Sequence, residues 1–437
     1  MSRTSFKDLI GCLRQTLAGL HDRRTGQNYS YEMVDFGLGA FSVFFTQSPS
    51  FLAHQKAMQT ARGANNAQSL FGIEVLPSDN HVRTMLDPVP PAALHPVYDR
   101  GYDALRQAGI LDSFRGVHDS RLIALDGTWY HSSQKIHCPC CSFLEHANGQ
   151  TTYYHSALTP VVVAPGRPEV ISLRPEFITP QDGHTKQDCE IAAAKRWLER
   201  NTARYLEGPV TLLGDDLYAH QPFCRRTLLY GFHFIFTCKP DSHTTLYRWV
   251  NLLQEPDLAT LKRRVKSGSQ WHTYTYRYAN RVPLADGHDA LQVNWCELTV
   301  TDPDNQVLYH NAWITDWPLT AQNLEALVAS GRSRWKIENE NNNTLKTKGY
   351  HLEHNFGHGK KHLAAFLLTL NLLAFLFHTV LGFTDAHYRL IRATLPSRKT
   401  FFQDLRALTR YLHFPSWQGL MRFMMRGLEI GPYAKAH

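Results

Sequence analysis

The stretch from Ser333 to Gly359 combines side chains that could bind a metal ion or a phosphate group. In a helix, Arg334 lies one turn before Glu338. Asn341 and Asn342 lie one turn after it, so all four side chains share one face. A carboxylate between a guanidinium and amides can coordinate a metal ion or support a charged network. Metal binding would require further carboxylates from elsewhere in the chain.

Two aspartates that follow short apolar runs can supply those carboxylates. Asp126 ends the run RLIALD, and Asp215 follows PVTLLG. Both runs are typical of buried strands with an acid at the carboxyl end. Asp216 is adjacent to Asp215, and neighbouring side chains of a strand point to opposite faces.

Together Asp126, Asp215 and Glu338 could hold two Mg²⁺ ions about 3.5–4 Å apart. One ion would activate water or a 3′-hydroxyl, and the other would stabilise the leaving oxygen. We expect Mn²⁺ to substitute for Mg²⁺. The chemistry is in-line attack on a phosphodiester without a covalent enzyme intermediate. Glu190 is a candidate fourth acid, but a role on a helix surface is the favoured interpretation.

The elements around these acids alternate between strands and helices. We expect three strands at 121–125, 153–164 and 169–178, followed by a helix at 188–207. A strand at 209–213, a helix at 220–230 and a fifth strand at 232–238 come next. This order matches the RNase H-like α/β arrangement. Catalytic residues of open α/β folds usually lie at the carboxyl ends of the strands.

Antiparallel strands at 271–278, 292–300 and 306–313 then interrupt the alternation. The predicted fold class is therefore α/β, an RNase H-like mixed sheet with an inserted antiparallel β region and helical regions at both ends. Five segments are expected. A helical N-terminal region covers 1–115, and the first part of the core covers 116–239. A β-rich insertion at 240–320 is followed by the Glu338 helix with a core helix at 321–383 and a basic helical C-terminal region at 384–437.

Composition and charge favour a globular protein with a polyanionic partner. Of the 437 residues, 43% are hydrophobic and 19% are charged, which excludes a disordered chain. Residues 331–437 hold 16 Lys and Arg against 6 Asp and Glu, although the whole chain carries only +8. Nucleic acid is the leading partner for such a region, and a solvated basic surface is the alternative. Eight irregularly spaced cysteines and the polar residues 2–11 indicate a reducing cytoplasm and no signal peptide.

The apolar run at 363–383 is long enough to cross a membrane. It contains Asn371 and His378, lacks flanking Trp and Tyr residues, and follows a strongly polar helix. We interpret it as a buried core helix and expect no membrane partner.

A Cys/His cluster lies between the first two predicted strands, where a β-hairpin is expected. Cys138 and Cys141, with His146 and His155, could bind structural Zn²⁺. Only one Cys pair is present, whereas strong zinc motifs usually contain two. Reduced cysteines in a hairpin are the alternative interpretation.

The motifs around the three acids resemble those of DDE transposases of bacterial insertion sequences, in the group marked by Y-x(2)-R-x(3)-E-x(6)-K. Arg334 and Glu338 in RWKIE match the R and E, while LIALDGT and TLLGDDLYA resemble the strands of the first and second Asp. These motifs together span about half of the chain. The family's second acid directly follows the Gly, which selects Asp215 and leaves Asp216 as a helix cap.

Two positions depart from the family signature. Its Tyr falls on Gly331, and its Lys falls on Leu345, one residue before Lys346. One residue is about 100° of helix rotation, so Lys346 can serve only if its side chain bends back or the helix carries a bulge. Lys348 is the competing candidate. The sequence assigns no role to the Asn-rich turn at 339–343.

The resemblance implies a transposase that cuts transposon ends and joins them to target DNA, using Mg²⁺ held by Asp126, Asp215 and Glu338. It implies that Arg334 and a lysine grip the terminal phosphates and that the N-terminal helical region binds the ends. The implied partners are double-stranded DNA, as terminal inverted repeats and as target, and a second copy of the chain in a homodimer on DNA. The implied location is the cytoplasm, at the nucleoid when DNA is bound.

Further residues are candidate DNA contacts. Trp317, or Trp313, could stack on a flipped base, as an aromatic does in resembling transposases, and a buried insertion core is the alternative. Lys360 and Lys361, with three nearby histidines, could contact phosphates, and a solvated polar loop is the alternative. The histidines are His351, His354 and His358.

Two other functions remain open. One is an RNase H-like nuclease that cuts DNA without joining it. The other is a non-catalytic DNA-binding descendant of a transposase.

Overall fold

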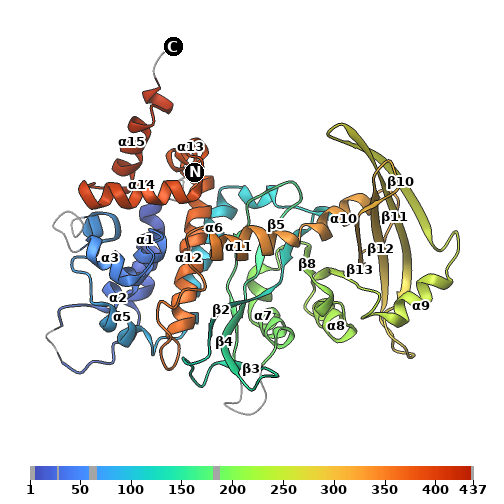
Figure 1. The fold of residues 1–437 in the computed structure, drawn as a ribbon, viewed down its shortest axis with the longest axis horizontal. Coiled ribbons are helices and arrows are strands. Elements are labelled where there is room, and N and C mark those ends of the chain that lie inside the picture. The colour runs from blue at the N-terminus through green and yellow to red at the C-terminus, as the bar shows by residue number, and fades with distance from the viewer. Residues whose placement is uncertain (1–4, 27–28, 59–65, 181–187, 435–437) are drawn as a thin grey trace.

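The helices from both ends of the chain gather at one end of the molecule, and strands β10 to β13 form the other end (Figure 1). The computed structural model describes residues 5–26, 29–58, 66–180 and 188–434. An α/β core lies between the two ends. The predicted fold class, a large mixed sheet with an antiparallel β region and flanking helical regions, is confirmed.

Within the described residues, one sheet contains nine strands in the order β10-β11-β12-β13-β9-β8-β1-β5-β6. In chain order these are β1 (Arg121–Ala124), β5 (Val161–Val163), β6 (Ile171–Ser172), β8 (Val210–Gly214), β9 (His233–Thr237), β10 (Ala259–Ser267), β11 (Gln270–Pro283), β12 (Gln292–Thr301) and β13 (Val307–Thr315).

The half of this sheet that contains β1 is mixed, as the predicted fold class requires. Strand β1 is parallel to β8, and β8 is parallel to β9. On its other side β1 is antiparallel to β5, and β5 is antiparallel to β6. Every residue of β1 and β8 is buried. Parallel strands are covered on both faces, which explains why their sequences are continuous apolar runs.

The inserted strands extend the core sheet. Strand β13 pairs antiparallel with β9, with Trp313 opposite Thr237, and β12, β11 and β10 follow outward. The sequence predicts three of these strands and misses β10. That strand, ATLKRRVKS, is largely exposed, so it lacks the alternating apolar pattern on which the prediction depends.

A second, smaller antiparallel sheet is formed by the part of the chain that leaves the main sheet after β1. Strand β4 pairs with β2, β3 and β7. The chain leaves the main sheet after β1 at Asp126 and returns to it at Thr159, whose backbone N–H donates to the Asp126 carbonyl at 3.1 Å. These strands are β2 (Gly127–Ser133), β3 (Ser142–Glu145), β4 (Thr151–Leu158) and β7 (Glu176–Ile178).

Helices accompany the core sheet and lead into the segment that carries Glu338. They are α7 (Glu190–Tyr205), α8 (Gln221–Leu229), α9 (Thr244–Leu252), α10 (Leu324–Arg332) and α11 (Asn343–Thr347). Short 3₁₀ and π-helical turns lie between larger elements, namely η1 (Ala67–Phe71), η2 (Pro91–Leu94), η3 (Ile110–Ser113), η4 (Val117–Asp119), η5 (Asp216–Tyr218), η6 (Ile337–Asn342) and η7 (Gly431–Tyr433).

The N-terminal and C-terminal helices form one helical unit around α12 (Figure 1). Phe41 and Phe45 on α2 contact Phe377 and His378 on α12, with ring centroids 5.0 and 4.5 Å apart. The unit comprises α1 (Phe6–Ala18), α2 (Met33–Phe45), α3 (Phe51–Met58), α5 (Asp79–Leu86), α6 (His95–Gln107), α12 (Leu363–Thr384), α13 (Ala386–Thr394), α14 (Arg398–Tyr411) and α15 (Trp417–Gly427).

Helix α12 has the length and apolar composition of a membrane span, but 83% of its most apolar stretch is buried in the protein. A Cβ atom at Gly101 of α6 would lie 2.9 Å from Leu376 of α12, so glycine allows close approach of the two helices. The packing confirms the prediction of a buried core helix.

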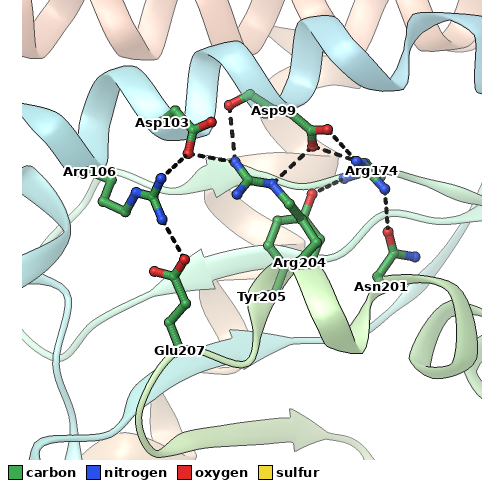
Figure 2. Close-up of polar contacts among 8 residues, drawn as sticks. All are labelled: Asp99, Asp103, Arg106, Arg174, Asn201, Arg204, Tyr205 and Glu207. Carbon is green, nitrogen blue, oxygen red and sulfur yellow. Dashed lines mark hydrogen bonds and ion pairs between the residues drawn. The ribbon is translucent and has the colours of Figure 1, made fainter.

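An ion-pair network joins the helical unit to the α/β core (Figure 2). Arg204 on α7 lies 3.1 Å from Asp99 and 2.7 Å from Asp103, both on α6. Asp99 also pairs with Arg174, which follows β6. The other members are Arg106, Asn201, Tyr205 and Glu207. The network links segments that the sequence separates by about a hundred residues.

Candidate active site

Asp126 and Asp215 lie at the same edge of the main sheet. Strands β1 and β8 are parallel neighbours with Ala124 opposite Leu213, and the pairing continues with a 2.9 Å hydrogen bond from the Leu125 N–H to the Leu213 carbonyl. Two residues beyond Ala124 and Leu213 are the two aspartates. The carboxyl ends of parallel strands therefore bring both acids to one place.

Asp215 and Asp216 have different partners. The Asp215 carboxylate caps the short turn η5 by accepting a 2.9 Å hydrogen bond from the Leu217 N–H. Asp216 accepts a 2.6 Å hydrogen bond from the Lys239 N–H after β9 and lies 3.3 Å from His243. The expectation that Asp216 caps the following helix is therefore wrong, because Asp215 is the cap and Asp216 contacts the end of the neighbouring strand. Asp215 also helps to raise the pKa of Asp126.

Glu338 reaches the same site from the C-terminal half of the chain. Its Oε1 lies 2.8 Å from Arg334 Nη2, as the spacing of one helical turn predicts. The Glu338 side chain is 50% exposed and that of Arg334 is 20% exposed. Four residues later, Asn342 Nδ2 donates a 2.8 Å hydrogen bond to Asp126 Oδ2. This bond ties the Glu338 segment directly to the end of β1.

Glu190 contacts the site, contrary to the interpretation of it as a helix-surface residue. It is the first residue of α7, and Tyr218 of η5 donates a 2.5 Å hydrogen bond to its Oε1. Its carboxylate also packs against Gly127, where a Cβ atom would lie 2.3 Å from Glu190 Oε2. The glycine after Asp126 therefore leaves room for a fourth acid. An acid at a helix start also occurs as an ordinary N-terminal residue, so the sequence offers no specific signal for this contact.

These carboxylates perturb one another. Burial, followed by the charge of Glu190, raises the pKa of Asp126 to about 7; Glu338 and Asp215 act in the same direction, while Arg334 opposes them. Burial also raises the pKa of Glu190, against the hydrogen bond from Tyr218. Four carboxylates face one guanidinium, and such an excess of negative charge is relieved by protons or by a bound cation. An all-oxygen donor set is the kind that Mg²⁺ prefers.

The segment that includes Glu338 and Lys346 is not a continuous α-helix. It contains a π-helical turn, η6, which takes up one residue more than an α-helical turn. By helix geometry, one extra residue shifts the following positions by about 100°, which is the offset between Leu345 and Lys346. Leu345 is fully buried, whereas Lys346 is partly exposed and forms a 3.0 Å ion pair with Glu353. Most of the Asn-rich sequence lies in the π-helical turn, and its Asn342 contacts Asp126.

Three of the other predicted DNA contacts are lysines on the surface. Lys348, Lys360 and Lys361 are exposed. Trp317 is at a different place from the acids: its ring stacks on His233 at 3.6 Å, and its Nε1 donates to Thr211 Oγ1 at 3.1 Å. Thr211 is near the start of β8, whereas Asp215 follows the end of that strand. Trp317 is therefore not brought to the carboxylates, and Trp313 is buried in the core.

Three of the four predicted zinc ligands converge, and one does not. Cys138, Cys141 and His155 lie together, but His146 is exposed and hydrogen-bonds Thr152 Oγ1 at 2.8 Å. His358, from the loop before α12, takes the fourth position. The sequence could not indicate this substitution, because His358 is more than two hundred residues from the other ligands.

Comparisons with known proteins leave the family open. No family model matches the chain, and no curated protein matches it. Among solved structures it is similar to "Cryo-EM structure of piggyBac transposase synaptic complex with hairpin DNA (SNHP)", at 8% identity and a TM-score of 0.39, over 99% of this chain and 84% of that chain. A TM-score of this size is too low to assign the fold or the function of that protein to this chain.

Proposed function

We propose that this chain is a DNA transposase that cuts transposon ends and joins them to target DNA. The observation that carries the proposal is the convergence of Asp126, Asp215 and Glu338 on one edge of the sheet. The three acids come from separate parts of the chain, and the charges of Asp215 and Glu338 both raise the pKa of Asp126. Asn342, four residues after Glu338, donates a hydrogen bond to Asp126. Their local sequences also resemble the three motifs of DDE transposases of bacterial insertion sequences.

Asp126, Asp215 and Glu338 would hold two Mg²⁺ ions, and Glu190 would join them. When bound, Mg²⁺ would lower the pKa of the attacking hydroxyl and stabilise the leaving oxygen. The protein itself orients this set: Asn342 fixes Asp126, Tyr218 fixes Glu190, and Arg334 fixes Glu338. Carboxylates held in this way need little reorganisation when the substrate arrives.

The proposed reaction has two balanced steps. Water attacks the phosphorus at the transposon end, the bond to the 3′-oxygen breaks, and a 3′-hydroxyl and a 5′-phosphate are released. The 3′-hydroxyl then attacks a phosphodiester of the target: its oxygen forms the new P–O bond, the bond to the target's 3′-oxygen breaks, and that oxygen leaves as a hydroxyl after taking up the proton that the attacking group loses. The second step conserves the number of phosphodiester bonds and requires no nucleotide cofactor.

The basic C-terminal quarter supports DNA as the partner. Residues 331–437 carry the excess of Lys and Arg, and exposed Lys348, Lys360 and Lys361 follow the Glu338 segment along the chain. Lys346 would contact a phosphate near the cut. Such contacts supply affinity without base selectivity. End binding by the N-terminal helices and a homodimer on DNA are further parts of the proposal.

The test uses the full chain and a duplex carrying the inverted repeats that flank its coding sequence, with Mg²⁺ and a target plasmid. We expect cleavage at the repeat ends followed by joined products. Glu338→Gln should abolish cleavage and retain end binding, while Glu340→Gln, two residues along the same segment, should keep both activities. Cleavage by Glu338→Gln would contradict the proposed triad.

Two other outcomes distinguish the alternatives. Cleavage by the wild-type chain without joined products, even with pre-cut ends supplied, would indicate a nuclease. Specific binding without cleavage in Mg²⁺ or Mn²⁺ would indicate a non-catalytic descendant.

A further inference from the structure

Four potential metal ligands from three segments meet between the small sheet and the loop before α12. Cys138 and Cys141 lie in the β2–β3 connection, His155 is on β4, and His358 lies in the loop. One ligand atom from each residue lies within 4.8 Å of all the others. This Cys/His site is separate from the carboxylates and does not depend on the proposed function.

Five of the six pairs of ligand atoms lie at distances close to those of a tetrahedral shell, and the sixth pair, Cys138 with His358, lies within 4.8 Å. The Cys138 and Cys141 sulfurs are 3.9 Å apart. His155 Nε2 lies 3.6 Å from Cys138 Sγ and 3.5 Å from Cys141 Sγ. His358 Nε2 is 3.4 Å from Cys141 Sγ and 3.1 Å from His155 Nε2. Ligands at Zn–S of about 2.3 Å and Zn–N of about 2.0–2.1 Å in a tetrahedron would be separated by about 3.8 Å for S–S, 3.6 Å for S–N and 3.3 Å for N–N.

Hydrogen bonds among these groups cannot satisfy all five short contacts. A thiol donates one hydrogen, and a neutral imidazole has one N–H. His358 Nδ1 lies 3.1 Å from the Gly359 carbonyl, which places the imidazole hydrogen on Nδ1 and leaves Nε2 as a lone-pair donor toward the cluster. His155 is almost fully buried with its Nε2 in the cluster. Two Nε2 atoms 3.1 Å apart are readily explained by a shared cation.

The backbone turn from Cys138 to Cys141 brings the two sulfurs together. The Cys141 N–H donates to the Cys138 carbonyl at 3.0 Å, and the Cys138 N–H approaches Cys141 Sγ at 3.4 Å. The two sulfurs therefore face the same side, as in a Cys-x₂-Cys ligand pair. Cys140, between them in sequence, is not among the four converging ligands.

We propose that Cys138, Cys141, His155 and His358 bind one structural Zn²⁺ ion. Two sulfurs and two imidazoles in a tetrahedral arrangement select zinc over Mg²⁺ or Ca²⁺, which prefer oxygen ligands. Four protein ligands leave no open position for water or substrate, so the site is structural and not catalytic.

The zinc ion would connect the two chain segments that leave the carboxylate site. Asp126 leads directly into β2 of the small sheet, and the Glu338 segment leads through α11 into the loop with His358. That loop has no helix or strand between Lys348 and His362, and it displays Lys360 and Lys361. The ion would fix this basic loop against the small sheet through ligands 203 residues apart.

The test measures metal in the full chain, purified without a histidine tag from zinc-supplemented medium and dialysed. We expect one zinc per chain by mass spectrometry. Replacement by Co²⁺ should produce thiolate-to-cobalt charge-transfer bands and the intense visible bands of a tetrahedral site. A chain without zinc, or a cobalt spectrum typical of octahedral oxygen coordination, would overturn the proposal without any variant.

Matched variants assign the ligands. His358→Gln and Cys141→Ser should lose most of the bound zinc, whereas His146→Gln and Cys140→Ser should retain it. Zinc retained in His358→Gln at the wild-type level, or lost in His146→Gln, would overturn the ligand set. If the first two variants fail to fold, the cobalt spectrum of the wild-type chain still decides, because the number of thiolates appears in its charge-transfer intensity.

Discussion

The side-chain amide of Asn342 donates a 2.8 Å hydrogen bond to the carboxylate of Asp126, 216 residues earlier in the chain. Asn342 also accepts a 3.1 Å hydrogen bond from Thr159, where the chain re-enters the main sheet. The segment that supplies the last acid of the site therefore also orients the first. Because Asn342 belongs to the π-helical turn, the widened helix and the position of Asp126 depend on each other.

Asn342→Ala should weaken Mg²⁺-dependent cleavage by removing the hydrogen bond that orients Asp126. Loss of such an outer partner typically costs about 10- to 100-fold in metal affinity or activity. The Mg²⁺ concentration for half-maximal cleavage should rise in that range. Asn343→Ala is the matched control, since the Asn343 side chain is exposed and donates its hydrogen bond to Asn339 in the preceding π-helical turn. Equal Mg²⁺ dependence of the two variants would contradict this role.

Glu190→Gln tests whether the fourth carboxylate contributes to cation binding. The substitution keeps the size of the side chain and its contact with Tyr218 while removing one negative charge from beside Asp126. We expect the apparent Mg²⁺ affinity to fall by about 10-fold or more. Glu199→Gln, at an exposed position of the same helix, should behave as wild type. An apparent Mg²⁺ affinity of Glu190→Gln equal to that of wild type would show that Glu190 does not contribute to cation binding.

Lys346→Ala tests whether Lys346 takes the place of the signature lysine after Glu338. If Lys346 contacts a phosphate, its loss should weaken DNA binding and reduce the salt dependence of log Kd by about 1. Lys348→Ala removes the same charge two residues later on a more exposed position. We expect the larger loss of cleavage with Lys346→Ala. The reverse order, measured at one fixed salt concentration, would assign the signature lysine to Lys348.

Because of the buried His54, we expect the folded protein to become less stable at acid pH. Burial lowers its pKa from 6.5 to about 4, and its Nε2 hydrogen-bonds Ser42 at 2.9 Å. The unfolded chain takes up this proton below pH 6.5 and the folded chain does not, so stability falls as the pH decreases from 6.5 toward 4. The contribution is about 1.4 kcal/mol per pH unit in that window. Thermal unfolding of His54→Gln should therefore depend less on pH than wild type.

The control for His54 is the exposed His288. His288→Gln should leave the pH dependence of the unfolding temperature unchanged. An identical pH profile for wild type and His54→Gln would contradict the predicted burial of an uncharged imidazole.

Asp99→Asn should loosen the junction between the helical unit and the core. Asp99 accepts from both Arg174 and Arg204, whose side chains are largely buried (Figure 2). Removing its charge takes away the carboxylate that pairs with Arg174 and leaves Arg204 paired with Asp103 alone, at a cost of about 2 kcal/mol in the free energy of unfolding. Asp112→Asn is the control, because Asp112 is 80% exposed and lies 3.7 Å from Arg115. Chemical denaturation should show a lower midpoint only for Asp99→Asn.

Local patterns in the sequence determined much of the core. The apolar runs before Asp126 and Asp215 are buried strands because parallel strands are covered on both faces. The spacing of Arg334 and Glu338 makes an ion pair because one helical turn separates them. These features depend on residues that are close in sequence, so periodicity and spacing are sufficient to predict them.

Only the tertiary structure decided which distant residues complete each site. Glu190 joins the acids, His358 replaces His146 among the metal ligands, and Trp317 lies away from the carboxylates. The pairing of β13 with β9 likewise merges the inserted strands with the core sheet. Each outcome depends on contacts between segments tens to hundreds of residues apart. Their side chains look the same in sequence whether they meet or remain on the surface, because the folded backbone sets the distance between them.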